Sequence, residues 1–206
     1  GTLGDAGDHF DTVGSVEHEG EPVEGFLVAS HQREQELDVE AFRRGDPQAV
    51  LAGDEPAVLV DAGLVDAIER GLSPATRVVV VDHITATTAL VLPLADIAAV
   101  CHANGTLVLA DGAHVPGNIA LDIESLGVDW YTANLHKWAW APRSCGILWS
   151  SPAQQEHLKP TVISWGLDSG MAAEFDLAGT RDPSAWLSAP FAIDLLHEHG
   201  LKDIHA

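Results

Sequence analysis

The sequence predicts an α/β fold in three layers, with a mainly parallel sheet and helices on both faces. Short apolar runs at residues 77–82, 106–110, 128–132 and 145–149 are typical of strands, and the first is too dense in valine for a sheet with one wet face. Segments with helical spacing alternate with these runs. Such alternation implies right-handed crossovers between parallel strands.

The helices between the strands are expected from their start and stop signals. A first helix is expected after Asp61, a candidate N-cap, and it stops near Gly71. A second is expected over residues 93–104, where an Asn-Gly pair provides a left-handed stop. A short helical turn at residues 123–126 ends at Gly127 and leads into the next strand.

The C-terminal part is expected to be helical at its two ends. A short helix is predicted over residues 152–158, followed by an irregular segment up to Gly179. The Asp-Pro pair at 182–183 is a strong helix start, with an acceptor at the N-cap and proline in the first turn. That last helix is expected to be kinked or restarted at Pro190 and to stop at Gly200.

The N-terminal region is poorly defined. Residues 1–25 are rich in glycine and acids without helical or strand periodicity, which predicts a flexible or poorly ordered start. Residues 26–30 could form an edge strand, and residues 31–44 could form a helix. The expected organisation is therefore an acidic N-terminal region over residues 1–60 and a domain over residues 61–200.

Charge and composition exclude several classes of function. The chain has 206 residues, 31 acidic against 10 basic, and a net charge of −21, which repels nucleic-acid phosphates and anionic membranes. No apolar run approaches the length of a membrane span. A cytoplasmic protein with no nucleic-acid or membrane partner is expected. The acid excess fits either a protein adapted to high salt or an ordinary acidic surface.

Lys137 is the most distinctive chemical group in the sequence. It is one of three lysines and lies between His136 and Trp138, in a loop between two predicted strands. We expect such flanking aromatic groups to desolvate the amine partly, and desolvation favours the neutral form that attacks a carbonyl. This is the chemistry of a lysine that forms a Schiff base.

Asp111 is its natural partner. It follows a predicted buried strand, at the carboxyl end where open α/β sheets bind ligands. An aspartate that faces a pyridine nitrogen keeps the ring protonated, and the protonated ring makes pyridoxal 5′-phosphate an electron sink. Asp111 could instead simply cap the turn at Gly112.

Several ordered motifs resemble the large domain of class V aminotransferases, a family of fold-type I pyridoxal phosphate enzymes that includes cysteine desulfurases and isopenicillin N epimerase. The resemblance covers roughly residues 65–196. The sequence shows neither the N-terminal phosphate-binding loop nor the C-terminal small domain that family members carry, which suggests a chain truncated at both ends. Two of the motifs are most similar to the epimerase-like branch. The motifs are Asp-Gly-Ala-His (111–114), the segment at 122–131, Asn-Leu-His-Lys (134–137) and Gly-Ile-Leu-Trp (146–149), with Asp-His-Ile-Thr (82–85) and Gly-Thr-Arg-Asp-Pro-Ser-Ala-Trp (179–186) closest to that branch.

The resemblance implies roles for eight residues. Lys137 would form the Schiff base, Asp111 would pair with the pyridine nitrogen, and His114 would contact the ring or its phenolic oxygen. The remaining five are implied near the cofactor: His136 at the phosphate, Asn134 where relatives often have serine, Thr180 reaching across a homodimer to the other subunit's phosphate, and His83 with Thr85 beside the cofactor.

The implied reaction is the removal of the α-proton of an amino acid, with the Lys137 amine as general base and a Cα carbanion stabilised by the ring. Epimerase, aminotransferase and carbon–sulfur lyase outcomes all fit. A desulfurase needs a mobile nucleophilic cysteine, whereas Cys101 and Cys145 are expected in the core. The alternative is a non-catalytic large-domain fragment that folds or dimerises without turnover.

The histidines also allow a metal site to be considered. The candidate ligands would be His83, Asp111, His114 and His136. None of the short histidine or paired-cysteine spacings typical of metal sites supports that interpretation, and the family resemblance explains the same residues without a metal. No metal is therefore expected.

Overall fold

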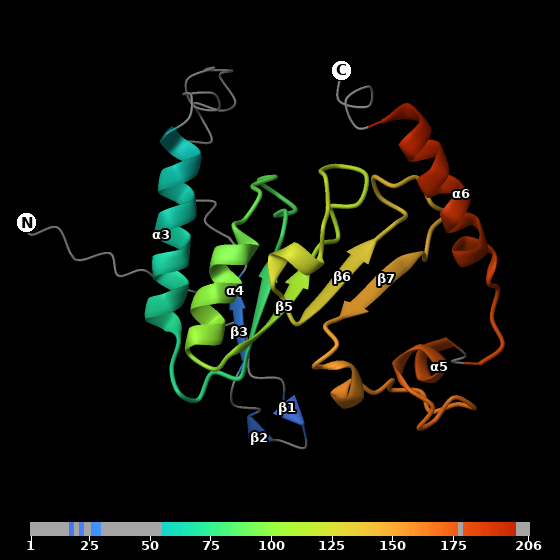
Figure 1. Ribbon diagram of the computed structural model, residues 1–206, viewed down its shortest axis with the longest axis horizontal. Coiled ribbons are helices and arrows are strands. Elements are labelled where there is room, and N and C mark those ends of the chain that lie inside the picture. The colour runs from blue at the N-terminus through green and yellow to red at the C-terminus, as the bar shows by residue number, and fades with distance from the viewer. Residues whose placement is uncertain (1–16, 19–20, 23–25, 30–54, 177–178, 201–206) are drawn as a thin grey trace, which may run out of the picture.

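A five-stranded sheet forms the centre of the molecule (Figure 1). The computed structural model describes residues 17–18, 21–22, 26–29, 55–176 and 179–200. The first four strands in the sheet are mutually parallel, and the last is antiparallel to its neighbour, which confirms the expected mainly parallel α/β sheet. In spatial order the strands are β3 (Phe26–Ala29), β4 (Val78–Asp82), β5 (Leu107–Asp111), β6 (Trp130–Asn134) and β7 (Gly146–Ser150).

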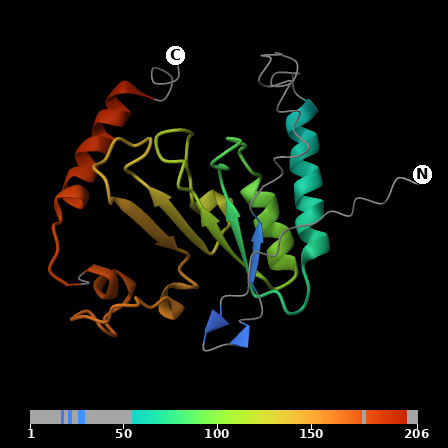
Figure 2. The same cartoon turned by 180° about the vertical axis from the view of Figure 1, so that it is seen from behind.

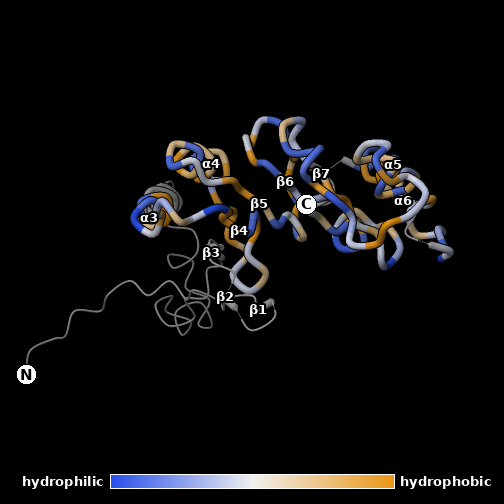
Figure 3. Tube along the Cα trace, turned by 90° about the horizontal axis from the view of Figure 1, so that it is seen from below, coloured by the Kyte–Doolittle hydropathy of each residue, from blue (hydrophilic) through white to orange (hydrophobic). Residues whose placement is uncertain are grey.

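Helices flank this sheet at both ends. Helices α3 (Glu55–Gly71) and α4 (Leu94–Ala103) lie together on one side of β4 and β5 (Figure 3). Helix α6 (Ser184–His199) lies at the opposite end of the sheet from α3, beyond β7 (Figure 2). The short elements are β1 (Glu17–His18) and β2 (Glu21–Pro22), which pair with each other, η1 (Glu124–Leu126), η2 (Gln155–His157) and α5 (Met171–Asp176).

The main core lies between the sheet and the α3–α4 pair. Alternate residues of β4, β5 and β6 are buried against it, because successive side chains of a strand point to opposite faces. The other positions of these strands, such as Val78 and Val80, are half-buried on the opposite face. The buried members of this core are Ile68, Val79, Val81, Leu92, Leu94, Ile97, Ala98, Cys101, Val108, Ala110, Val128, Tyr131 and Ala133.

A second, smaller core joins α6 to the loop between β6 and β7. Leu135, Ala139 and Ala141 of that loop are buried with Ala189 and Leu196 of α6. This packing holds the loop that carries Lys137 against a helix. The loop, residues 135–145, is called the lysine loop below.

Most helix ends fall where the sequence predicts them. Helix α4 ends at Asn104 with Gly105 at φ +76°, η1 ends at a left-handed Gly127, and α6 ends at Gly200. Glycine adopts these positive φ values without the steric cost that a Cβ would impose. The edge strand expected at residues 26–30 is also present, as β3.

Several element boundaries were predicted wrongly. Helix α3 begins at Glu55, so Asp61 lies inside the helix rather than at its N-cap. Pro56 stands in the first turn, where proline is favoured because its missing N–H has no helical partner. Strand β6 begins two residues later than expected, at Trp130.

The C-terminal region also differs from the prediction. The segment expected to be irregular contains α5, and the helix expected over residues 152–158 is only the three-residue η2. Helix α6 continues through Pro190, which is exposed. The helix expected at residues 31–44 and most of residues 1–25 lie outside the described residues.

Asp129 is a buried acid that joins two strands and a helix. Its side chain is at the entry to β6, and the residue is 7% exposed. Oδ2 accepts a hydrogen bond from the backbone N–H of Val108 in β5 at 2.8 Å and lies 2.9 Å from Nε2 of His102 in α4. A buried carboxylate is stable only when its oxygens are paired in this way.

We predict that Asp129→Ala lowers the free energy of unfolding by about 1–3 kcal/mol, because it leaves the buried Val108 N–H without an acceptor. Urea unfolding of both proteins measures the change. Asp122→Ala is the matched control: Asp122 is exposed, and its side chain accepts a long 3.4 Å bond from the Ser125 N–H, so a change within about 0.5 kcal/mol is expected. Equal effects of the two substitutions would contradict the role given to Asp129.

Candidate active site

The carboxyl ends of β4, β5 and β6 meet at one edge of the sheet. Asp82 at the end of β4 is the register partner of Asp111 at the end of β5, and Asp111 is in turn opposite Thr132 of β6. Ligands of open α/β sheets bind at such an edge. Two carboxylates therefore occupy neighbouring positions there.

The loop that follows β5 packs directly on the lysine loop. Gly117 has φ +84°, and a Cβ at this position would lie 2.2 Å from the carbonyl oxygen of Trp138. Only glycine permits both the backbone conformation and this approach. Gly112, in the same loop, is similarly close to Tyr131, since a Cβ on Gly112 would lie 2.1 Å from the Tyr131 hydroxyl oxygen.

The Lys137 amine lies against His114. Nζ of Lys137 is 3.1 Å from Nε2 of His114, and the indole N–H of Trp138 donates to Nδ1 of the same ring at 3.3 Å. His114 therefore bridges the lysine and the tryptophan that follows it. The sequence placed Lys137 and His114 near each other but gave no indication of the Trp138 contact.

Lys137 is exposed, which corrects the expectation of a desolvated amine. The flanking indoles do not cover it, since Trp138 is 49% and Trp140 is 44% exposed. The ring of Trp140 instead lies 6.0 Å from that of His199 in the last turn of α6. Aromatic neighbours in the sequence thus do not supply the desolvation expected of them.

Asp82 belongs to the same electrostatic cluster and was not anticipated. Burial raises the pKa of its carboxyl, and the neighbouring charge of Asp111 raises it further, while His114 and Lys137 act in the opposite direction. Asp82 ends the valine-rich strand, next to the strand that ends at Asp111. This position is the sequence signal that could have identified it. The cluster thus consists of Asp82, Asp111, His114 and Lys137.

His83 and Thr85 use their polar atoms inside the fold. His83 is 6% exposed, its Nδ1 lies 2.9 Å from the Tyr131 hydroxyl, and burial lowers its pKa. Thr85 is 3% exposed, and its hydroxyl accepts the N–H of Leu90 at 2.9 Å and bonds to Thr88. Both residues therefore stabilise the segment after β4.

His136 is held by the backbone of the lysine loop. Its Nδ1–H donates to the carbonyl oxygen of Cys145 at 2.9 Å, which orients the ring. Asn134 is the last residue of β6, opposite Gly146 of β7. Both residues flank the entry to the lysine loop.

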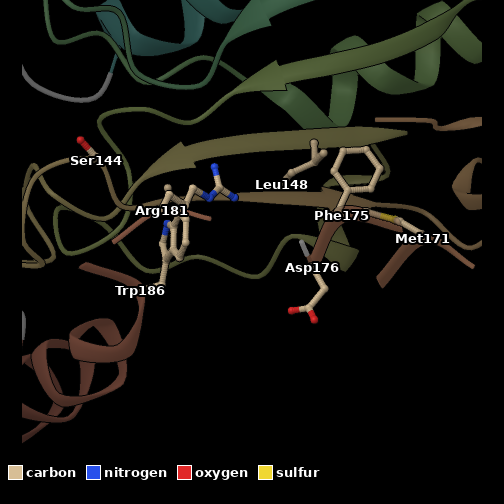
Figure 4. Close-up of a pocket in the computed structure, with 8 residues that line it drawn as sticks. Ser144, Leu148, Met171, Phe175, Asp176, Arg181 and Trp186 are labelled. Atoms are coloured by element: carbon tan, nitrogen blue, oxygen red, sulfur yellow. The ribbon is translucent and has the colours of Figure 1, made fainter. Parts of the chain in front are cut away.

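Thr180 lies apart from these residues in the segment before α6, where it is exposed. The next residue, Arg181, stacks on the ring of Trp186 at 4.0 Å and lines a pocket of about 530 Å³ with Leu148 and Phe175 (Figure 4). Among the described residues, no hydrogen bond or ion pair is found between Thr180 and the Lys137 cluster. The role expected of Thr180 in another subunit stays a prediction.

Both cysteines are buried, as predicted. The pKa of Cys101 is raised to about 11 by burial and then by Asp129, and burial also raises the pKa of Cys145. Neither thiol has the exposure and lowered pKa of a nucleophile.

No set of three or more histidine, cysteine or acidic side chains suited to a metal ion is found among the described residues. Over the same residues, no helix is both long enough and apolar enough to cross a membrane.

A model of the family described as aminotransferase class V matches residues 57–206. The chain belongs to this family. The match begins within α3 and includes the whole cluster at the sheet edge.

Relatives of this class V chain include epimerases and desulfhydrases. Isopenicillin N epimerase of Streptomyces clavuligerus is 34% identical over 161 residues, which are 70% of this chain and 40% of the relative. A probable chloroplastic L-cysteine desulfhydrase of Arabidopsis thaliana is 32% identical over 164 residues, 77% of this chain and 34% of the relative. The class V chain thus spans between about a third and two fifths of the length of these curated relatives.

A solved structure is also similar to the class V chain. The cystine C–S lyase C-DES, in complex with its product cysteine persulfide, has a TM-score of 0.61 and 30% identity over 68% of this chain and 40% of that one. A mutant of C-DES carries glycine covalently linked to its PLP cofactor, with a TM-score of 0.60 and 28% identity.

We predict that the stability of this class V chain falls as the pH drops from 7 to 5, partly because of His83. Its folded pKa lies below the ordinary value of 6.5, so the unfolded chain takes up a proton that the folded chain does not, and stability is lost as the pH falls through 6.5. Urea unfolding at several pH values should give a shallower pH dependence for His83→Gln. The exposed His157 provides the control His157→Gln, with an unchanged slope. An unchanged slope for His83→Gln would contradict the prediction.

We predict that Gly117→Ala lowers the free energy of unfolding by at least about 1–2 kcal/mol, the cost of a left-handed conformation for alanine, with the clash against Trp138 added. Chemical denaturation measures it. Gly63→Ala is the control, because Gly63 lies inside α3 with nothing within 4 Å of an added Cβ, and a gain of about 0.5–1 kcal/mol is expected there. A neutral Gly117→Ala would show that the two loops are not in close contact.

Proposed function

We propose that this chain is part of the large domain of a class V enzyme that binds pyridoxal 5′-phosphate at Lys137 and acts on an amino acid. The observation that carries the proposal is the 3.1 Å contact between Nζ of Lys137 and Nε2 of His114, at the sheet edge where Asp111 ends its strand. The family match and the cofactor named for the C-DES mutant support it. In this proposal the large domain covers residues 61–200.

The chemistry of the cluster fits that cofactor. Pyridoxal phosphate has an aldehyde, a phenolic oxygen and a pyridine nitrogen, which call for an amine, a hydrogen-bonding group and a carboxylate. Lys137, His114 and Asp111 supply these groups from two loops that pack on each other. One oxygen of Asp111 accepts the N–H of Ala113 at 2.9 Å, which holds the carboxylate in place.

The phosphate would be held by groups around the lysine loop. His136 is oriented by the Cys145 carbonyl through Nδ1, so its Nε2 is the atom proposed to face the phosphate. Asn134 stands at the entry to the same loop. Thr180 is proposed to serve the other subunit of a homodimer, which agrees with its exposed position outside the cluster.

His83 and Thr85 receive a supporting role in this proposal. Their polar atoms are engaged with Tyr131 and with the turn at residues 85–90. They would therefore shape the wall of the site beside Asp82 rather than hold the cofactor through hydrogen bonds.

The bound cofactor supplies an electron sink for the substrate's Cα. The residues of the chain supply positioning and proton transfer. Nζ of Lys137 takes the α-proton, and His114 positions that amine by its hydrogen bond. The Asp111 carboxylate, with Asp82 beside it, would keep the pyridine nitrogen of the bound cofactor protonated by its negative charge.

The reaction outcome that we propose is epimerisation or carbon–sulfur cleavage. Epimerase appears in the name of a relative at 34% identity, and C–S lyase appears in the description of C-DES at 30% identity. Persulfide transfer through a cysteine of this segment is disfavoured, because Cys101 and Cys145 are buried and their pKa values are raised. A cytoplasmic location stays a prediction.

A second candidate function is a segment that folds or dimerises without turnover. The two candidates differ in whether an amino acid alters the bound cofactor.

We predict that added pyridoxal phosphate binds covalently to Lys137, since its amine lies in the cluster that fits the aldehyde. Borohydride reduction followed by peptide mass spectrometry locates the attached group, and visible absorbance measures its amount. Lys137→Ala should abolish both signals, whereas Lys159→Ala should keep them, because Lys159 pairs with Glu174 at 2.7 Å away from the site.

Attachment to Lys159 as readily as to Lys137, or no attachment, would overturn the proposed site. A bound cofactor whose absorbance no amino acid changes would favour the non-catalytic candidate.

A further inference from the structure

The hydrogen bonds of His114 determine which of its ring nitrogens carries the proton. The indole nitrogen of Trp138 can only donate, so Nδ1 of His114, at 3.3 Å from it, must be an acceptor without a proton. A neutral imidazole then carries its proton on Nε2. That N–H points to Nζ of Lys137, at 3.1 Å.

This arrangement requires a particular form of the lysine. An Nε2–H donor needs a lone pair on its partner, and only the neutral amine of Lys137 has one, because an ammonium group has three donors and no acceptor. If Lys137 were an ammonium group, Nε2 of His114 would have to be the acceptor, and the ring proton would sit on Nδ1. The Nδ1–H group would then face the Trp138 N–H, so that two donors would meet with no acceptor between them. Both contacts of His114 exist together only when Lys137 is neutral.

We propose that Trp138 is a positioning residue: its indole N–H fixes the tautomer of His114, and His114 thereby favours the neutral, nucleophilic amine of Lys137. The importance of this for catalysis rests on the proposed function, whereas the tautomer and the state of the amine do not.

Lys137 is exposed, so burial does not favour its neutral form. The carboxylates of Asp82 and Asp111, at the ends of β4 and β5, attract the ammonium form. His136 in the lysine loop is bonded to the Cys145 carbonyl. Of these neighbours of Lys137, His114 is the one whose hydrogen bond favours the neutral amine.

The backbone keeps Trp138 in place for this role. The Trp138 carbonyl oxygen lies 2.2 Å from where a Cβ on Gly117 would be, and Gly117 is three residues after His114. The indole and the imidazole therefore come from two segments whose backbones are in contact. The pairing is therefore set by backbone packing as well as by the side chains. Trp140, two residues later in the same loop, contacts His199 of α6 instead.

The test compares Trp138→Phe, which removes the N–H and keeps an aromatic ring, with Trp140→Phe as the matched control. The whole chain, without added cofactor, is modified with trinitrobenzenesulfonate over a range of pH, and peptide mass spectrometry follows each lysine. Lys159 is an internal reference, because its hydrogen bond to Glu174 raises its pKa.

In wild type, Lys137 should be modified faster than Lys159 near neutral pH. Trp138→Phe should slow the modification of Lys137 near neutral pH by roughly three- to tenfold, the size expected for the loss of one hydrogen bond. Trp140→Phe should leave the rate unchanged. Equal rates for Lys137 in wild type and Trp138→Phe would overturn the inference.

The tautomer itself provides a second readout that a merely structural role of Trp138 would not produce. Nitrogen-15 chemical shifts of the His114 ring, assigned by their loss in His114→Gln, should show the Nε2–H form in wild type and a mixture in Trp138→Phe. An Nδ1–H form in wild type would overturn the inference even if Trp138→Phe failed to fold. Neither measurement uses pyridoxal phosphate, so a failure of cofactor attachment would refute the proposed function alone.

Discussion

The candidate site depends on one close approach, in which the backbone of Gly117 lies against the carbonyl of Trp138. The two loops involved leave different strands, β5 and β6: the first follows Asp111 and carries His114, and the second carries Lys137 and Trp138. A side chain at Gly117 would separate them. Because glycine allows the loops to touch, the imidazole reaches the lysine amine on one side and the indole on the other.

Charge and hydrogen bonding act in opposite directions on the Lys137 amine. Two carboxylates at the sheet edge, Asp82 and Asp111, favour a cation there, and they also suit a protonated pyridine ring. The His114 contact, with its tautomer set by Trp138, favours the neutral amine. An exposed lysine can therefore be poised for reaction by its hydrogen-bond partners without being removed from water.

Buried polar groups outside the site hold the sheet edge in place. Asp129 joins β5 and α4 at the opposite ends of the strands, and Tyr131 packs on Gly112 while bonding to His83. The small core of α6 fixes the lysine loop from the other side. The site is thus built on loops that are anchored by a rigid sheet and by a helix.

A large part of the fold followed from local patterns. The strands, the glycine stops and the convergence of Asp111 and Lys137 at one edge could be predicted, because strand periodicity and parallel topology together place strand ends side by side. Local patterns did not predict features that are set by contacts between residues far apart in the sequence. Helix α5 packs its backbone at Ala173 closely on Gly166, and the exposure of Lys137 depends on where Trp138 and Trp140 turn.

The sequence alone determined the family and the parallel sheet, since these follow from residue types in a fixed order along the chain, and it singled out Lys137 as the amine that we propose to be reactive. Tertiary structure decided which nitrogen of His114 meets Lys137 and which carboxylate lies beside Asp111. These are relations between residues from different strands and loops. Their distances are fixed only when the sheet closes and the backbones of the two loops come into contact.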